Sequence, residues 1–176
     1  MAKTAVVFCS EYGSTKRYAA YIAEKLQADL LSIEDAKDVS SYDTVVYGGG
    51  IYAGALNGNE WLKKNQASLC NKKLILFTCS ISDPNIERNR ENIQKGLEKC
   101  LSQELISHSK IFYFRGALAY QRLKLTHKGM MKVLFQILKH KKDRSPEEDA
   151  MLQTQETPVD FVDTSQADAL ITFIKD

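Results

Sequence analysis

Long apolar runs and metal-binding patterns are both missing from this 176-residue sequence. No run reaches the roughly 18 apolar residues of a membrane-spanning helix. The amino terminus has one lysine and then a five-residue apolar run, which is too short for a signal peptide. The four cysteines, Cys9, Cys70, Cys79 and Cys100, show no CxxC spacing and no nearby histidine pair, so we expect no metal site. We therefore expect a cytoplasmic protein with reduced thiols.

A strong excess of one charge is also missing. The formal net charge is +2, and 44% hydrophobic with 26% charged residues is an ordinary globular composition. These values indicate neither disorder nor a nucleic-acid partner. With no internal repeat and no interdomain linker, we predict a single domain over residues 1–176.

Charge is nevertheless distributed unevenly toward the carboxyl end of the chain. From Arg115 to Arg144 there are nine basic residues and one acid, Asp143. From Ser145 onward there are eight acids and one basic residue, Lys175. Two solvated faces would explain this pattern as well as an anionic partner or a lipid surface, and the sequence leaves both open.

Short apolar runs alternate with helical patterns along most of the chain. The runs are Ala5–Cys9, Leu30–Ile33, Thr44–Tyr47, Leu74–Cys79 and Ile111–Phe114. They are nearly continuously hydrophobic, as in strands buried on both faces, and apolar residues recur at helical spacing between them. This alternation predicts an α/β protein with an open parallel sheet covered by helices on both faces. It fails at about 118–158, which we expect to be a basic helical insertion after the fifth strand.

The most informative stretch is SEYGST, which directly follows the first strand and opens a helix. A helix N-terminus has unpaired N–H groups and a partial positive charge, so it attracts anions. Three hydroxyl side chains add donors, and Gly13 permits a sharp turn. A simple helix cap needs only one hydroxyl, so we predict a phosphate site. The loop lacks G-x-x-x-x-G-K-[ST] and is therefore not a triphosphate loop.

SEYGST resembles the phosphate loop of flavodoxins, in which a hydroxyl-x-x-Gly-x-Thr pattern holds the phosphate of FMN. The resemblance continues in YGGGIYAG at the third strand and TCSISD at the fourth. It implies a flavodoxin-like α/β fold with a five-stranded parallel sheet, order 2-1-3-4-5, and FMN at the topological switch point. A branch of that fold, the FMN-containing, quinone-dependent protoporphyrinogen dehydrogenases, is similar in GALAYQRLKLTHKGMMKVLFQILK as well.

The resemblance assigns cofactor-binding residues in three loops. Those for the phosphate are Ser10, Glu11, Tyr12, Gly13, Ser14 and Thr15. Those beside one side of the isoalloxazine ring are Gly49, Gly50, Ile51, Tyr52, Ala53 and Gly54. Those beside the other side are Ser80, Ile81, Ser82 and Asp83. Flavodoxins commonly have an aromatic residue in this last loop, and SISDPN has none, which would leave one flavin face open to a substrate.

A dinucleotide site is the alternative for the glycine-rich loop, because Gly48, Gly50 and Ala53 fit G-x-G-x-x-A. Such a site requires an acidic residue about 20 positions later, at the end of the next strand. Leu69-Cys70-Asn71-Lys72 occupies that region, before the next strand begins. The sequence therefore favours FMN over a dinucleotide.

The resemblance implies an oxidoreductase that takes electrons from a porphyrinogen and passes them to a quinone in haem biosynthesis. Arg115, Tyr120, Arg122 and Lys124 are candidate substrate contacts, since arginine suits propionate carboxylates. The alternative is a flavodoxin-type electron carrier with protein redox partners. Apolar residues of Leu123–Lys142 would form one wide face, opposite lysines, that packs on the core, covers the active site or lies on the inner face of the cell membrane.

Overall fold

The computed structural model describes residues 3–176, and these residues divide into two compact units. The first contains the chain up to Gly116 and again from Val162, and the second is Ala117–Phe161. The second unit coincides closely with the insertion predicted at about 118–158. The prediction of one domain over residues 1–176 stays a prediction.

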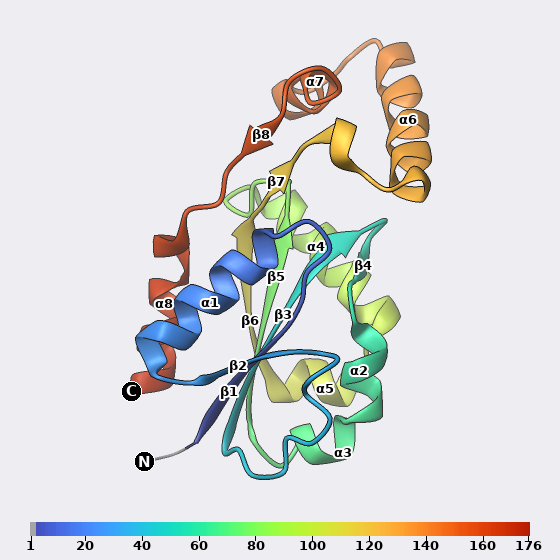
Figure 1. The fold of residues 1–176 in the computed structure, drawn as a ribbon. Helices are drawn as coiled ribbons and strands as arrows, with labels where there is room; N and C mark the ends of the chain where they lie inside the picture. The colour runs from blue at the N-terminus through green and yellow to red at the C-terminus, as the bar shows by residue number, and fades with distance from the viewer. Residues whose placement is uncertain (1–2) are drawn as a thin grey trace. The chain divides into compact units, whose positions relative to one another are not determined.

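The first unit is built around a parallel sheet (Figure 1). Its parallel strands are β1 (Thr4–Cys9), β2 (Asp29–Ser32), β3 (Thr44–Tyr52), β5 (Lys73–Ser80) and β6 (Ser109–Arg115). They pair in the order β2-β1-β3-β5-β6, which confirms the predicted order of five parallel strands. A short antiparallel strand that the sequence did not indicate, β4 (Ala55–Leu56), pairs with β3.

Helices cover both faces of this sheet, as predicted. One face carries α1 (Ser14–Leu26), the short helix η2 (Thr164–Ala167) and α8 (Asp168–Lys175). The other carries α2 (Asn59–Lys64), α3 (Gln66–Leu69), α4 (Glu87–Cys100) and α5 (Gln103–His108). Alternate residues of the central strands point to opposite faces, so Val45 and Tyr47 join one core and Val46 joins the other.

The strands differ in burial according to their place in the sheet. The first seven residues of β3 are buried, as the hydrophobic runs predicted. In the edge strands β2 and β6, most residues are exposed or partly buried. The prediction of burial on both faces was therefore wrong for the edges, because an edge strand lacks a neighbouring strand on one side.

The second unit contains a two-stranded antiparallel ribbon and three helical segments. The ribbon is formed by β7 (Ala117–Leu118) and β8 (Val159–Asp160). Between them lie the short helix η1 (Tyr120–Arg122), α6 (Leu125–His140) and α7 (Pro146–Gln153). Within the described part of the chain, no helix has the length and apolarity to cross a membrane.

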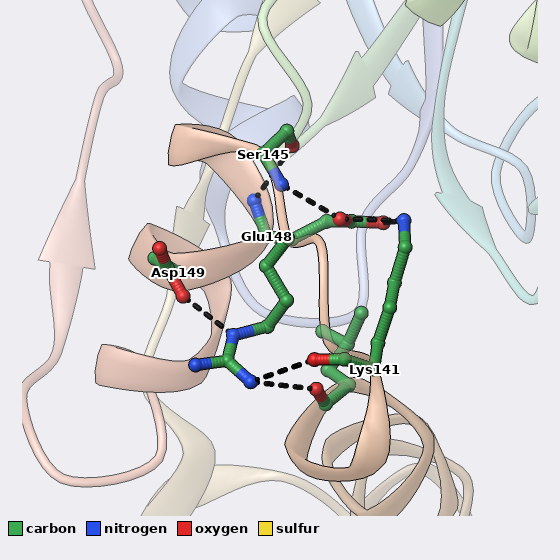
Figure 2. A network of polar contacts seen from close by, with 6 residues as sticks. Lys141, Ser145, Glu148 and Asp149 are labelled. Atoms are coloured by element: carbon green, nitrogen blue, oxygen red, sulfur yellow. Dashed lines mark hydrogen bonds and ion pairs between the residues drawn. The ribbon is translucent and has the colours of Figure 1, made fainter.

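Ion pairs and caps hold the α6–α7 connection together (Figure 2). Ser145 and Glu148 form a capping box, in which each side chain bonds the backbone N–H of the other. The ammonium of Lys141 donates to both carboxylate oxygens of Glu148, at 2.7 and 2.8 Å. Arg144 donates to Asp149 at 2.6 Å and to the carbonyls of Leu138 and Lys141. Some of the uneven charge is thus internally paired.

Candidate functional site

The three predicted cofactor loops lie at one edge of the sheet. Parallel pairing places Cys9 beside Gly49, and Gly50 beside Cys79, so β1, β3 and β5 end side by side. From β1 the chain passes to β2 on one side, and then to β3 on the other. The switch point therefore lies at the carboxyl ends of β1 and β3, where open α/β sheets bind ligands.

The first loop leads from β1 into the N-terminus of α1. Its Ser10 hydroxyl oxygen accepts hydrogen bonds from the backbone N–H groups of Gly13, at 3.2 Å, and Lys16, at 3.3 Å. Gly13 occupies the N-cap position with a φ of 98°, and a Cβ built there would meet nothing within 4 Å. Because a positive φ is costly for any residue with a side chain, the backbone requires glycine here.

This loop fits an anion. The first turn of α1 has no acidic residue, and its N-cap residue, Gly13, has no side chain that could cap it. The space above Gly13 is open, and Thr15 is buried at 2% exposure at the start of the helix. Lys16 and Arg17 are exposed. Backbone N–H groups and the helix dipole are accordingly the main attraction that this loop offers to a phosphate.

The second loop is a tight hairpin between β3 and β4. Tyr52 pairs with Ala55, which leaves Ala53 and Gly54 as the two turn residues. Both have a positive φ, 50° and 79°, as the type I′ hairpin turn requires. The sequence predicted a glycine-rich loop here, whereas Gly48, Gly49 and Gly50 belong to β3 itself.

Tyr52 connects the hairpin to the phosphate loop. Its ring lies edge-on to the ring of Tyr12, with 5.7 Å between centroids and 80° between planes. Its hydroxyl lies 2.7 Å from where a Cβ of Gly50 would be, so the ring folds over the bare backbone of β3. Burial raises the pKa of the Tyr52 phenol, which is therefore neutral at physiological pH.

The third loop, Ser80–Asp83, is fastened to neighbouring elements. Gly116 donates its N–H to the carbonyl of Ser80 at 2.7 Å. The Asn89 side chain donates to the carbonyl of Asp83 at 2.9 Å. The Arg115 guanidinium donates to the carbonyl of Ile81 at 3.3 Å and lies 3.7 Å from the Asp83 carboxylate. This loop therefore has a set shape from its own contacts.

Arg115 is anchored through its backbone as well. Its carbonyl accepts from the Tyr18 hydroxyl at 2.8 Å, and its N–H donates to the side-chain oxygen of Gln166 at 3.1 Å. The same Tyr18 hydroxyl accepts from the N–H of Asp163 at 3.2 Å. Tyr18, Asn89 and Gln166 were missed by the sequence reasoning, since no local pattern marks a residue that acts through a long-range contact.

The other candidate substrate contacts belong to the second unit. Arg122 and Lys124 are exposed, the first in η1 and the second just before α6. The Tyr120 ring packs edge-on against Phe135, at 5.4 Å between centroids, and the Lys128 ammonium lies over it. Tyr120 thus contributes to the packing of its own unit.

The apolar face of α6 is only partly buried. The sequence placed Met130, Met131, Val133, Leu134, Ile137 and Leu138 on one wide face. In the structure Leu138 is buried together with Phe135, whereas Met130, Val133 and Ile137 are 44%, 61% and 61% exposed. The helical spacing of α6 places these six residues on one wide face, as predicted, but only part of that face packs within the unit.

The described residues indicate neither a metal site nor a reactive thiol at Cys9. The part of the chain from residue 3 onward has no group of three or more His, Cys, Asp and Glu that could hold a metal ion. Burial raises the pKa of the Cys9 thiol, so this cysteine at the end of β1 is protonated at neutral pH.

An open parallel sheet with an anion-binding helix N-terminus at its switch point defines a phosphate-binding α/β protein. A family model described as a flavodoxin domain matches residues 5–145, well over half of the chain. The protein belongs to this flavodoxin family. Family membership supports the predicted cofactor, FMN, and the open loop at Gly13 fits its phosphate.

Several solved structures are similar to this chain at low sequence identity. A WrbA-like flavodoxin from Agrobacterium tumefaciens is 22% identical, with a TM-score of 0.47, over 62% of this chain and 76% of that one. A flavoprotein from Lactobacillus acidophilus, solved with FMN, is 13% identical, with a TM-score of 0.48, over 65% and 93% of the two chains. Flavodoxin 2 from Bacillus cereus is 17% identical, with a TM-score of 0.45, over 65% and 84%. No curated protein matches the sequence significantly.

Proposed function

We propose that this protein is an FMN-dependent oxidoreductase that takes electrons from a porphyrinogen and delivers them to a quinone. The observation that carries the proposal is the second unit. In the sequence it directly follows β6, and its α6 region combines basic residues with exposed apolar ones. A large, flat substrate with carboxylates and an apolar acceptor would both find suitable groups there.

FMN, when bound, supplies the redox chemistry, and the residues of the chain supply binding and orientation. The phosphate loop holds the anionic end through the N-terminus of α1. Tyr52 and the loop Ser80–Asp83 border the ring. Because the latter loop has no aromatic side chain, we propose that one side of the ring stays accessible to substrate.

A flavodoxin-type electron carrier is the alternative. Carriers of that type are usually strongly acidic so that they can meet basic protein partners, whereas this chain has a net charge of +2. The basic residues gathered between Arg115 and Arg144 would repel such partners. Charge therefore favours the oxidoreductase.

The two functions are separated by anaerobic mixing of the FMN-loaded protein with protoporphyrinogen. We expect bleaching of the flavin absorbance, followed by its recovery when a menaquinone is added. If protoporphyrinogen leaves the flavin oxidised while a flavodoxin reductase reduces it rapidly, the carrier function is correct. A protein that retains no FMN would exclude both.

The second unit also supplies a surface for the membrane in which a quinone dissolves. Met130, Val133 and Ile137 recur at helical spacing and are exposed. Lys132 and Lys139 lie on the same helix and make no ion pair with any acid of residues 3–176. We propose that the exposed surface of Met130, Val133 and Ile137 contacts anionic lipid peripherally, and that Lys132 and Lys139, on the other side of the same helix, add electrostatic attraction.

A further inference from the structure

Helix α4 supports the hairpin that carries Tyr52. A Cβ built on Gly96, which is buried in α4, would overlap the carbonyl oxygen of Gly54 and lie 3.1 Å from its carbonyl carbon. Real Cβ atoms do not approach backbone so closely. The turn of Ala53 and Gly54 therefore rests directly on the bare backbone of the helix.

The helix is the fixed partner in this contact. Ile93 and Leu97 lie on either side of Gly96 in the sequence of α4 and are buried in the core at 6% and 0% exposure. Ala53 and Gly54 are exposed, and both have a positive φ. A side chain at position 96 would thus displace the two-residue turn more readily than the 14-residue helix.

Displacement of the turn is transmitted to Tyr52, which directly precedes it. The Tyr52 ring is held on one side by the bare backbone at Gly50 and on another by the Tyr12 ring. A shift of the Tyr52 Cα moves the whole ring. It therefore changes the contact with the Gly50 backbone and the contact with the Tyr12 ring at the same time.

We propose that Gly96 is a positioning residue for the cofactor site: its missing side chain sets the height of the Ala53-Gly54 turn and thereby the orientation of the Tyr52 ring toward the flavin. The inference rests on the proposed binding of FMN. The sequence predicted no role for α4 in the site. The inference gives this helix a part in cofactor affinity.

The test compares Gly96→Ala with Gly129→Ala. Gly129 is a glycine in α6 with nothing within 4 Å of its Cβ position, so it reports the general effect of alanine on a helix without the contact. We expect Gly96→Ala to weaken FMN binding about tenfold, which is the usual size of the effect when one side chain loses its contacts. Gly129→Ala should leave FMN binding unchanged. Riboflavin binding should weaken by the same factor, since the displaced group borders the ring and not the phosphate.

A double-mutant cycle shows whether Gly96 acts through Tyr52. In the Tyr52→Ala background, Gly96→Ala should have no further effect on FMN affinity, whereas a merely structural role would give additive losses. Should Gly96→Ala not fold, Gly54→Ala perturbs the exposed turn directly and is expected to give the same non-additive result. Unchanged FMN affinity in these variants, or additivity with Tyr52→Ala, overturns the inference. If the wild-type protein binds no FMN, the proposed function fails instead.

Discussion

The guanidinium of Arg115 lies 3.7 Å from the carboxylate of Asp83, which joins the end of β6 to the loop after β5. The same guanidinium donates to the carbonyl of Ile81, so one side chain fixes two points of that loop. Both side chains are about three-quarters withdrawn from solvent, with 26% and 29% exposure. Arg115, a candidate substrate contact from the sequence, thus has a defined role in shaping the third cofactor loop.

We expect Arg115→Gln to weaken FMN binding by about 1 kcal/mol, because the loop loses a partly screened ion pair and a charged hydrogen bond. Isothermal titration of the apoprotein with FMN measures this loss. Arg88→Gln, at an exposed position of α4, removes the same charge elsewhere and should have no effect. A rise in the KM for porphyrinogen with an unchanged Kd for FMN would instead favour the direct substrate contact.

Thr15→Ala tests the phosphate loop. The Thr15 side chain is 2% exposed and lies at the first turn of α1. If it bonds the phosphate, its removal costs roughly 1–3 kcal/mol, as for other buried hydrogen bonds to a charged group. FMN affinity should fall accordingly while riboflavin affinity stays the same, because riboflavin has no phosphate. Thr172→Ala, an exposed threonine in α8, is the matched control. Equal losses for both ligands would place the phosphate elsewhere.

The phenol of Tyr18 makes the free energy of unfolding depend on pH in the alkaline range. Burial raises the pKa of its phenol from 10.0 to about 12, and its hydroxyl bonds Arg115 and Asp163. Between these two pH values the unfolded chain loses the phenol proton and the folded protein keeps it, so the free energy of unfolding falls as pH rises. Below pH 10 the contribution is fully present.

Denaturant unfolding at pH 9 and pH 11 measures this dependence, with those values chosen on either side of the ordinary tyrosine pKa of about 10. The decrease should be smaller in Tyr18→Phe than in the wild type, because phenylalanine cannot ionise. Tyr120, which packs against Phe135 in the second unit, serves as a control when changed to phenylalanine. Identical decreases in wild type and Tyr18→Phe would show that other groups dominate.

The sequence predicted those features that depend on local patterns. Buried strands such as β3 and β5 show as continuous apolar runs, and their alternation with helices predicts an open parallel sheet. The order of the strands was predicted from the resemblance to flavodoxins. The turn between β1 and α1 was visible in the sequence because its hydroxyl residues and Gly13 lie close together, and its binding of phosphate stays a prediction. Even the extent of the second unit followed from the point at which the alternation stopped.

Contacts between distant segments could not be predicted in this way. Tyr12 meets Tyr52, and Gly96 meets Gly54, only after β1, β3 and α4 have packed together. The exposed side of α6 was missed for a related reason. A wide apolar face gives no sequence signal for which part of it packs and which part faces outward.

Neutralising Arg122 and Lys124 together tests the basic side chains of the second unit. Both are exposed and would suit the propionate groups of a porphyrinogen. Replacing both with glutamine should raise the KM for protoporphyrinogen about tenfold while FMN stays bound, given the usual strength of two charge-assisted contacts. Lys95 and Lys99, exposed on α4, form a control pair for the same substitutions. An unchanged KM would remove these residues from the substrate site.

The exposed surface of α6 predicts binding to anionic membranes. The wild-type protein should co-sediment with vesicles of phosphatidylcholine and phosphatidylglycerol, weakly with phosphatidylcholine alone, and less at high salt, since each lysine near an anionic surface contributes about 1 kcal/mol. Replacing Val133 and Ile137 with aspartate should abolish binding, because it removes exposed apolar side chains and adds negative charge.

Thr126→Asp with Gln136→Asp separates these two causes. Both residues are exposed on α6, so the pair adds the same negative charge and leaves every apolar side chain in place. We expect this control to retain part of the vesicle binding that the Val133 and Ile137 variant loses. Equal losses in both variants would mean that the attraction is purely electrostatic. No vesicle binding by the wild type, even at low salt, would exclude the membrane contact and leave the reaction with porphyrinogen to be judged by the flavin absorbance alone.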